Sequence, residues 1–386
     1  MRRLYAIFLL LLATFVYTVA QEVVPDSIGS ETPCHEDSIE TKSKTLNISQ
    51  RVVGFLSDNL KEFNESDTVY IEPQHYDFCA MMQNTNTYEL YRLSTQSGQS
   101  ILFAPKPTYR VGPYFGWRWL FLGYTFDISH LSNESNKKEF DLSIYSNLIS
   151  IDLYYRKTGT DYLIREIDFN DKRIGRRRLH NVPFDGLNVG ITGVNVHYIF
   201  NHKKFSYPAA FSQSTVQRRS CGSALAGVGY TRHSIKLDYD RLKDVLTGIM
   251  PELSDGIGEV QLDSGLTFNN VRYTDISLSG GYAYNWVPAR NWLVAASLSL
   301  ALGYKYSSGM LLKDEDTILT NFSFKNVALD GTGRFGIVWN NTKWFAGMSA
   351  IVHSYSYKKR QFSADNFFGS LNFYVGFNFC RKKNEK

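Results

Sequence analysis

Histidine, serine and cysteine side chains supply many metal ligands and nucleophiles, so their spacing is the first test for chemistry. The eight histidines show no His-Glu-x-x-His or His-x-His spacing, so we predict no zinc site. His233-Ser234 and His353-Ser354 are sequence neighbours, and neighbouring strand residues face opposite sides. A serine hydrolase needs its partners on one side, and no Gly-x-Ser-x-Gly elbow or phosphate loop is present. We therefore expect no catalytic, cofactor-binding or metal-binding residues. A protein that is not an enzyme is the interpretation that we favour.

One strongly basic run stands out among the charged residues. It contains Lys172, Arg173, Arg176, Arg177 and Arg178. Arginine presents two parallel donors to phosphate or carboxylate, so the run is a candidate site for anionic lipid headgroups or an acidic partner. A solvated periplasmic loop is the simpler interpretation, and we prefer it.

The six tryptophans fall in pairs around three short connections. The pairs are Trp117 and Trp119, Trp286 and Trp292, and Trp339 and Trp344. Tryptophan favours membrane interfaces because its ring is apolar while its N–H reaches the wet headgroup zone. The six are therefore predicted to form an aromatic girdle at the inner rim of a membrane barrel.

The elements that would position these residues are strands. From Tyr76 to Phe379 the apolar residues alternate with small or polar ones, most clearly from Trp292 to Tyr306. Short connections alternate with long polar ones, such as 238–269 and 307–320, as in outer-membrane barrels. Twelve strands are expected, near 118–128, 138–147, 149–157, 162–169, 192–201, 206–214, 223–236, 270–286, 291–306, 322–340, 343–357 and 367–379.

We thus expect an all-β fold, a transmembrane antiparallel up-and-down β-barrel of about 12 strands (range 10–14). Residues 99–115 are expected to add a further pair of strands. A soluble β-sandwich shows the same alternation, and it remains an alternative. The aromatic share of 15% favours strands and membrane interfaces. The mean hydropathy of −0.26 does not argue against a barrel, because only every second residue faces lipid.

The N-terminus has the three parts of a secretory signal peptide. Arg2 and Arg3 precede an apolar run, and Thr18-Val19-Ala20 resembles a cleavage site before Gln21. We divide the chain into a signal peptide (1–20), a periplasmic linker with one amphipathic helix (21–75), the barrel (76–380) and a charged tail (381–386). Export through this signal to the cell outer membrane of a gram-negative bacterium is expected.

The four cysteines show neither metal spacing nor a Cys-x-x-Cys motif. Free thiols and disulfides both remain open in an exported protein. Because closing a barrel brings its first and last strands together, we predict that Cys79 and Cys380 approach each other.

Two segments resemble the signatures of a known family. They are Val111-Gly112-Pro113-Tyr114-Phe115-Gly116-Trp117-Arg118-Trp119 with Leu122-Gly123-Tyr124, and Phe205 to Phe211 with Gln217 and Ser220-Cys221-Gly222-Ser223. They are similar to an outer-membrane β-barrel family of Bacteroides-like bacteria described only as a domain of unknown function (DUF4421-like). The resemblance spans about residues 65–380 and implies a barrel but no activity, since the family has no assigned site residues to carry over.

The inward positions of the C-terminal strands are expected to be small and mostly uncharged, for example Ser277, Gly281, Ser297, Ser299 and Gly347. A porin constriction usually carries charged rings, and this sector shows none. Small residues leave space for a ligand, a plug or large side chains from the opposite wall, and the last is the simplest interpretation.

A binding or transport protein, or a narrow channel, is the function that we favour for such a barrel. An outer-membrane enzyme acting on lipid or protein and a secreted soluble β-protein are the alternatives. Outer-membrane lipid, the barrel-assembly machinery and an unidentified small solute are the expected partners. A net charge of only +5 gives no support for nucleic acid.

Overall fold

The computed structural model describes residues 66–117, 120–123, 126–127, 138–158, 161–170, 176–254, 263, 270–308, 326–358 and 362–382. The predicted signal peptide, the predicted amphipathic helix and residues 383–386 of the charged tail lie outside these residues. None of the described helices is long and apolar enough to cross a membrane.

Most described residues belong to one large antiparallel sheet. Its strands are β2 (Tyr76–Thr95), β3 (Ser100–Pro105), β4 (Thr108–Trp117), β5 (Leu120–Gly123), β6 (Phe126–Asp127), β7 (Lys138–Tyr145), β8 (Ile149–Lys157), β9 (Tyr162–Asp168), β10 (Arg176–Phe184), β11 (Leu187–Ile199), β13 (Cys221–Leu237), β14 (Asn270–Ala289), β15 (Trp292–Ser308), β16 (Val327–Asn340), β17 (Trp344–Lys358) and β18 (Phe362–Arg381). They follow the order β10-β9-β3-β2-β18-β17-β16-β15-β14-β13-β11-β8-β7, and β4 pairs with β2, β5 and β6.

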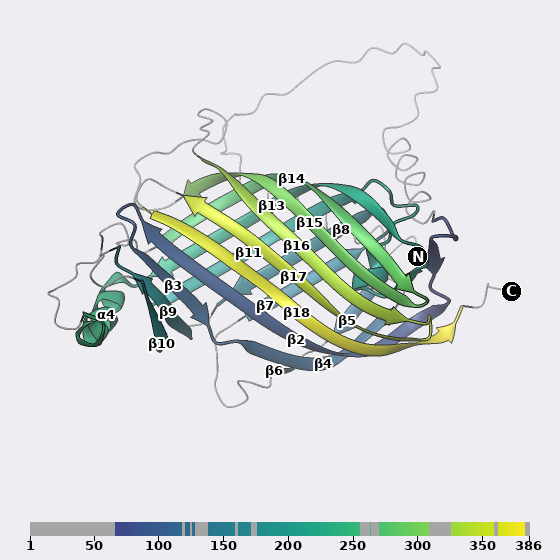
Figure 1. Cartoon of the computed structure of the whole chain (residues 1–386), viewed down its shortest axis with the longest axis horizontal. Helices are drawn as coiled ribbons and strands as arrows, with labels where there is room; N and C mark the ends of the chain where they lie inside the picture. Colours follow the sequence, from purple (N-terminus) through teal and green to yellow (C-terminus); the bar gives the residue numbers. More distant parts are fainter. Residues whose placement is uncertain are drawn as a thin grey trace, which may run out of the picture. The chain divides into compact units, whose positions relative to one another are not determined.

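The sheet curls on itself into a barrel (Figure 1). Interior contacts show the curvature, because they join strands far apart in the sheet order. Arg334 of β16 forms an ion pair with Asp152 of β8, and the Tyr154 hydroxyl of β8 lies 2.7 Å from the Tyr355 hydroxyl of β17. Among the described residues β7 pairs only with β8, so no described hydrogen-bonded pair joins it to β5 or β6.

One end of the barrel, the tryptophan end, carries the tight turns between β14 and β15 and between β16 and β17. Register places Trp292 opposite Trp339 and Trp344 opposite Phe377 at this end. Here β1 (Ile71–Pro73) and β12 (Thr215–Gln217) form a second, two-stranded sheet. The short helix α3 (Pro208–Phe211) comes directly before β12 in the chain.

The opposite end, the cap end, extends beyond the barrel. There β2 changes partner from β4 to β3, and β3 continues the sheet into β9 and β10. Helix α4 (Tyr239–Ser254) follows β13 and buries Leu242 and Leu246. Its two leucines join a large apolar cluster with the interior side chains of β3, β9, β10 and the ends of β2, β14 and β17.

The all-β, antiparallel fold expected from the sequence is confirmed, but the sheet of the described residues has 16 strands where about 12 were predicted, and several boundaries are corrected. The predicted strand at 206–214 contains helix α3 instead, because this segment folds inside the tryptophan end. The predicted strand near 162–169 is β9, which belongs to the cap and pairs with β3 and β10. The expected loop at 238–269 begins with α4, and 99–115 contributes β3 and most of β4.

Candidate functional site: the filled barrel interior

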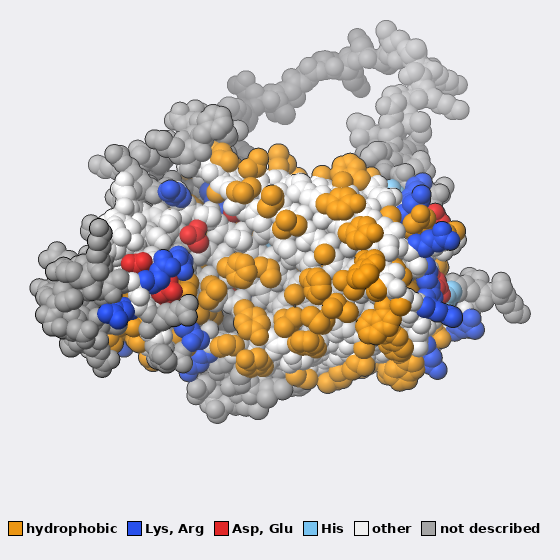
Figure 2. Space-filling view, in the orientation of Figure 1, with side chains coloured by type: hydrophobic (Ala, Val, Ile, Leu, Met, Phe, Trp, Pro, Cys, Tyr) orange, Lys and Arg blue, Asp and Glu red, His pale blue; other side chains and the backbone are white. Residues whose placement is uncertain are grey.

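The two faces of the sheet differ sharply in polarity. Large apolar side chains cover the outer face, including Leu278 (70% exposed), Leu302 (62%), Phe115 (61%), Leu298 (60%) and Leu329 (59%). Figure 2 shows apolar side chains spread over the visible face, while lysines and arginines gather toward its two ends. In β15 the exposed leucines alternate with Ser297 and Ser299, which are buried, as the period-two pattern predicted.

The first interior ion pair joins Arg334 of β16 to Asp152 of β8. Both side chains are almost fully buried, at 1% and 7% exposure. Asp152 also accepts a 2.7 Å hydrogen bond from Ser143, and the guanidinium lies 5.8 Å from the ring centre of Tyr207. A buried charge needs such a partner, because removing one member leaves the other unpaired at low dielectric.

A second pair, Glu89 of β2 and Arg156 of β8, lies nearer the cap, with 3.4 Å between the carboxylate and guanidinium. The Arg156 guanidinium also stacks 4.7 Å from the ring centre of Phe368. Beside it, Tyr154 bridges the barrel to Tyr355 and Thr231 through its hydroxyl. These contacts cross the interior, so they hold opposite walls together.

A third group contains Lys305 of β15 and two carboxyl groups. The Lys305 ammonium donates to Asp330 at 2.7 Å and lies 3.7 Å from Asp275. All three side chains are at most 3% exposed. The charged positions 275, 305, 330 and 334 correct the expectation of an uncharged C-terminal sector, which considered only the small inward residues.

Large side chains pack over the small inward residues. An added Cβ at Gly193 would meet the Tyr154 ring, and one at Gly347 would lie 2.8 Å from the Tyr374 hydroxyl. These rings fill the interior over residues that have no side chain of their own. The sequence analysis preferred filling by side chains from the opposite wall, but at these two positions the ring comes from the neighbouring strand, because Gly193 pairs with Tyr154 and Gly347 with Tyr374.

A plug, residues 205–217, closes the tryptophan end. Asn285 of β14 donates to the Ser206 carbonyl at 2.8 Å and to the Gln217 side chain at 3.0 Å. Gln213 donates to the Tyr374 hydroxyl of β18 at 2.8 Å. These bonds fasten the plug to separate strands of the wall. The plug coincides with the second family signature, so that motif contributes to interior structure.

Breaking one plug anchor is expected to loosen the segment. Asn285→Ala removes the donor to the Ser206 carbonyl and leaves the Gln217 amide oxygen with only the Ser206 N–H, at a cost of about 1–3 kcal/mol. We expect faster trypsin cleavage at Lys204 and Arg218, read by mass spectrometry of the folded barrel. Asn188→Ala, on β11 near the cap end, is the control and is expected to leave cleavage unchanged. Equal rates in both variants would contradict this anchoring.

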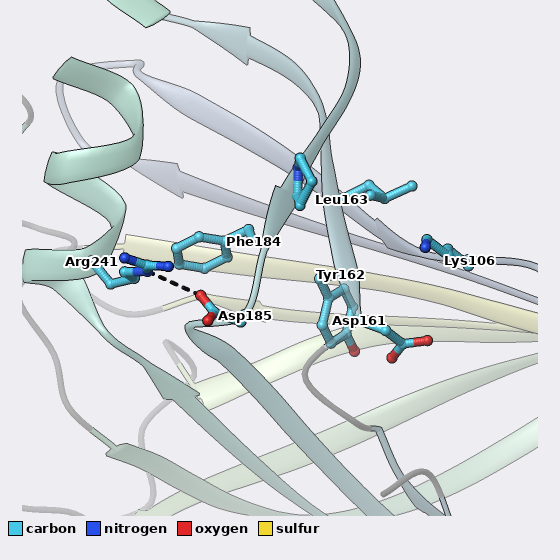
Figure 3. Close-up of a pocket in the computed structure, with 8 residues that line it drawn as sticks. Lys106, Asp161, Tyr162, Leu163, Phe184, Asp185 and Arg241 are labelled. Carbon is cyan, nitrogen blue, oxygen red and sulfur yellow. Dashed lines mark hydrogen bonds and ion pairs between the residues drawn. The ribbon is translucent and has the colours of Figure 1, made fainter. Parts of the chain in front are cut away.

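A cleft of about 210 Å3 lies on the cap, between β9, β10 and α4. Figure 3 shows Arg241 of α4 pointing to Asp185, with Lys106 and Asp161 lying apart from this pair. The guanidinium is 3.1 Å from the carboxylate and holds the pKa of Asp185 below its ordinary value. Both side chains are more than half exposed, so solvent weakens their attraction.

The structure describes the side chains of four of the six tryptophans in the predicted girdle. Trp286, Trp292 and Trp344 are 52%, 45% and 48% exposed at the tryptophan end. Trp339 is half-buried and shares the parity of the exposed Phe335. The side chain of Trp117 and the whole of Trp119 lie outside the described residues, and the membrane role of the six stays a prediction.

The described part of the basic run lies on a strand and not in the expected periplasmic loop. Arg176, Arg177 and Arg178 lie on β10 at the cap end, while Lys172 and Arg173 lie outside the described residues. The Arg176 side chain contacts Glu166 and Asp168 on β9 at 3.4 and 3.3 Å. The arginines therefore belong to an edge strand of the cap, at the opposite end from the tryptophan turns.

Strands β2 and β18 pair along nearly their whole length, as expected for first and last strands. Cys79 lies opposite Asn378, and both Cys79 and Cys380 are free thiols. Cys79 is buried while Cys380 is exposed, so the sulfurs face different surroundings. The strands of the predicted pair are neighbours, and no disulfide joins them.

The described residues contain no group of three or more metal-ligating side chains. Of the buried histidines, His353 contacts the Thr332 hydroxyl at 3.2 Å, and neither His197 nor His233 is bonded to a serine or cysteine. The interior ion pairs escaped the sequence analysis. Their signal was a lone charge at an inward position of an alternating strand, as at Lys305 and Arg334.

An antiparallel barrel with an apolar exterior and ion-paired interior has the architecture of a membrane β-barrel. The chain belongs to the family described as Domain of unknown function (DUF4421), whose match covers residues 65–379. No curated protein sequence matches the chain.

Several solved outer-membrane proteins show a distant structural similarity to the chain. The outer-membrane protease OmpT of Escherichia coli is 7% identical with a TM-score of 0.32, covering 78% of this chain and 96% of that chain. The toluene transporter TodX of P. putida is 8% identical with a TM-score of 0.21 (79% and 91%), and the translocator domain of autotransporter NalP of Neisseria meningitidis is 9% identical with 0.27 (86% and 96%). A similarity of this size says nothing about function.

Proposed function

We propose that the protein is an integral β-barrel of the bacterial outer membrane, exported through a cleaved signal peptide, with a lumen that is closed at rest. Its role is binding or transport that needs a rearrangement of the interior, and it is not a passive pore. The main observation behind this proposal is the reversed polarity of the barrel, which is apolar outside and has buried ion pairs inside. In a bilayer core every backbone group must be satisfied within the protein, which a barrel achieves.

The exposed apolar face argues against the soluble alternative. Soluble monomers rarely expose a contiguous apolar patch larger than a few hundred Å2. Here exposed leucines follow one another on adjacent strands, with Leu278 opposite Leu302 and Leu302 opposite Leu329. Lipid is the partner that this face fits.

The closed lumen supports gated transport or binding over free diffusion. The plug fills the tryptophan end, ion pairs and stacked rings cross the middle, and an apolar core fills the cap end. Solutes would pass only if some of these contacts opened. An enzyme acting on lipid or protein is less favoured, because no serine or cysteine is seen hydrogen-bonded to a buried histidine of the described residues, and His353 contacts only the Thr332 hydroxyl.

Planar-bilayer recording tests this proposal. Refolded protein inserted into the bilayer is expected to give no steady conductance, because three levels of the lumen are blocked. Insertion is checked independently by carbonate-resistant association with vesicles. A stable open channel in the unmodified protein would contradict the closed lumen, and release by carbonate would contradict membrane integration.

A further inference from the structure

The cluster of Lys305, Asp275 and Asp330 has one cation for two carboxyl groups. All three side chains are at most 3% exposed. They lie next to the stacked rings of His233, Tyr273 and Tyr357 near the cap end. The Lys305 ammonium lies 5.8 Å from the ring centre of Tyr355, and Tyr355 contacts His233. His233 stacks on Tyr273, which in turn stacks on Tyr357. Two ionised carboxylates here would leave a net negative charge in a low-dielectric interior, which is strongly unfavourable.

The hydrogen bonds distinguish the two carboxyl groups. One Asp330 oxygen, Oδ1, accepts from the Lys305 ammonium at 2.7 Å and from the Ser356 backbone N–H at 3.0 Å. This is the environment of an ionised carboxylate. Asp275 is farther from the ammonium, at 3.7 Å.

The remaining oxygens lack donors. Asp275 Oδ1 and Asp330 Oδ2 are buried and have no hydrogen-bond partner. The two carboxyl groups are neighbours, because both lie against the same Lys305 ammonium, at 3.7 and 2.7 Å. Gly303 makes room for this approach, because an added Cβ would collide with the Asp275 carboxyl. Two acceptors facing each other without a hydrogen between them would repel.

We propose that this cluster is a proton-binding site, in which Asp275 is a neutral carboxylic acid that donates its O–H to Asp330 Oδ2. One bound proton satisfies both orphaned oxygens and leaves Lys305 and Asp330 as a single neutral ion pair. The site ties β14, β15 and β16 together and reaches β17 through the Ser356 carbonyl, which accepts from Lys305 at 2.5 Å. Release of the proton would place an unpaired charge directly beneath the apolar cap.

Two substitutions separate this arrangement from a cluster with two ionised carboxylates. Asp275→Asn keeps a donor toward Asp330 and adds no charge, so the unfolding rate of the barrel in detergent is expected to change little. Asp330→Asn removes the anion at 2.7 Å from the ammonium and leaves only Asp275 at 3.7 Å, and unfolding is expected to accelerate on the order of a hundredfold. The rate is followed by loss of the compact, fast-migrating form in gel electrophoresis.

Infrared spectroscopy tests the proton directly on variants that fold. The unmodified barrel at neutral pH is expected to show a carboxylic-acid C=O band, which Asp275→Asn removes and the exposed control Asp185→Asn retains. Absence of that band, or equal acceleration by Asp275→Asn and Asp330→Asn, would overturn the proposal. Stability that rises with sodium concentration and no acid band would assign a metal cation to the cluster instead, and would likewise overturn it.

Discussion

Replacing Arg334 by methionine is expected to destabilise the folded barrel by about 3–5 kcal/mol. The substitution leaves Asp152 buried without its cation, with Ser143 as its remaining side-chain donor among the described residues. Since typical domains are stable by only about 5–15 kcal/mol, much of the folded population would be lost. Urea unfolding of the protein in detergent micelles or vesicles gives the free energy of unfolding.

The double variant Asp152→Asn with Arg334→Met provides the control for this effect. With both charges removed, most of the lost stability is expected to return, because a buried ion pair often contributes little over neutral groups of similar volume. A double variant as unstable as the single one would show that Arg334 acts through packing, for example against Tyr207, and not through charge.

Replacing Leu300 by arginine is expected to cost about 2–4 kcal/mol in a bilayer, or to prevent insertion. Leu300 is half exposed on the outer face near the middle of β15, so the guanidinium would lie near the bilayer midplane. Folding into vesicles, followed by the migration shift in gel electrophoresis, measures the effect.

Two matched variants separate the effect of the charge from the loss of the leucine and from its depth in the membrane. Leu300→Ala removes apolar surface without adding charge and is expected to insert. Trp292→Arg places the same charge at the tryptophan end, where the penalty is expected to fall to about 0–1 kcal/mol beyond the loss of the ring. Equal penalties at positions 292 and 300 would contradict the predicted depth of the tryptophans, and full tolerance of Leu300→Arg would contradict the membrane face.

The predicted and observed strands agree best where alternation is long and uninterrupted. Trp292 to Tyr306 predicts β15 and its faces, because side chains on a strand alternate regardless of which strand lies next to it. The assignments were wrong where the chain leaves the wall. Residues 206–214 carry apolar residues that face the barrel interior as a plug, and local periodicity does not separate such a segment from a strand.

The interior chemistry shows the same division. The sequence contains Lys305, Asp330 and Arg334 as isolated charges, and the parity of the strands is sufficient to turn them inward. It does not say that Arg334 meets Asp152, which lies 182 residues earlier, since that contact depends on how far the sheet curls. Nor does it say that Glu89 meets Arg156 from another wall.

The β-class, the alternation of an apolar outer and a smaller, more polar inner face, and the family resemblance could all be predicted from the sequence. These are local properties, repeated strand after strand with a period of two residues. The ion pairs and rings that cross the interior, the plug of residues 205–217 and the cap formed by β3, β9 and β10 could be recognised only in the tertiary structure. Those features depend on contacts between distant strands, which are set by the tilt and curvature of the whole sheet and not by any one segment.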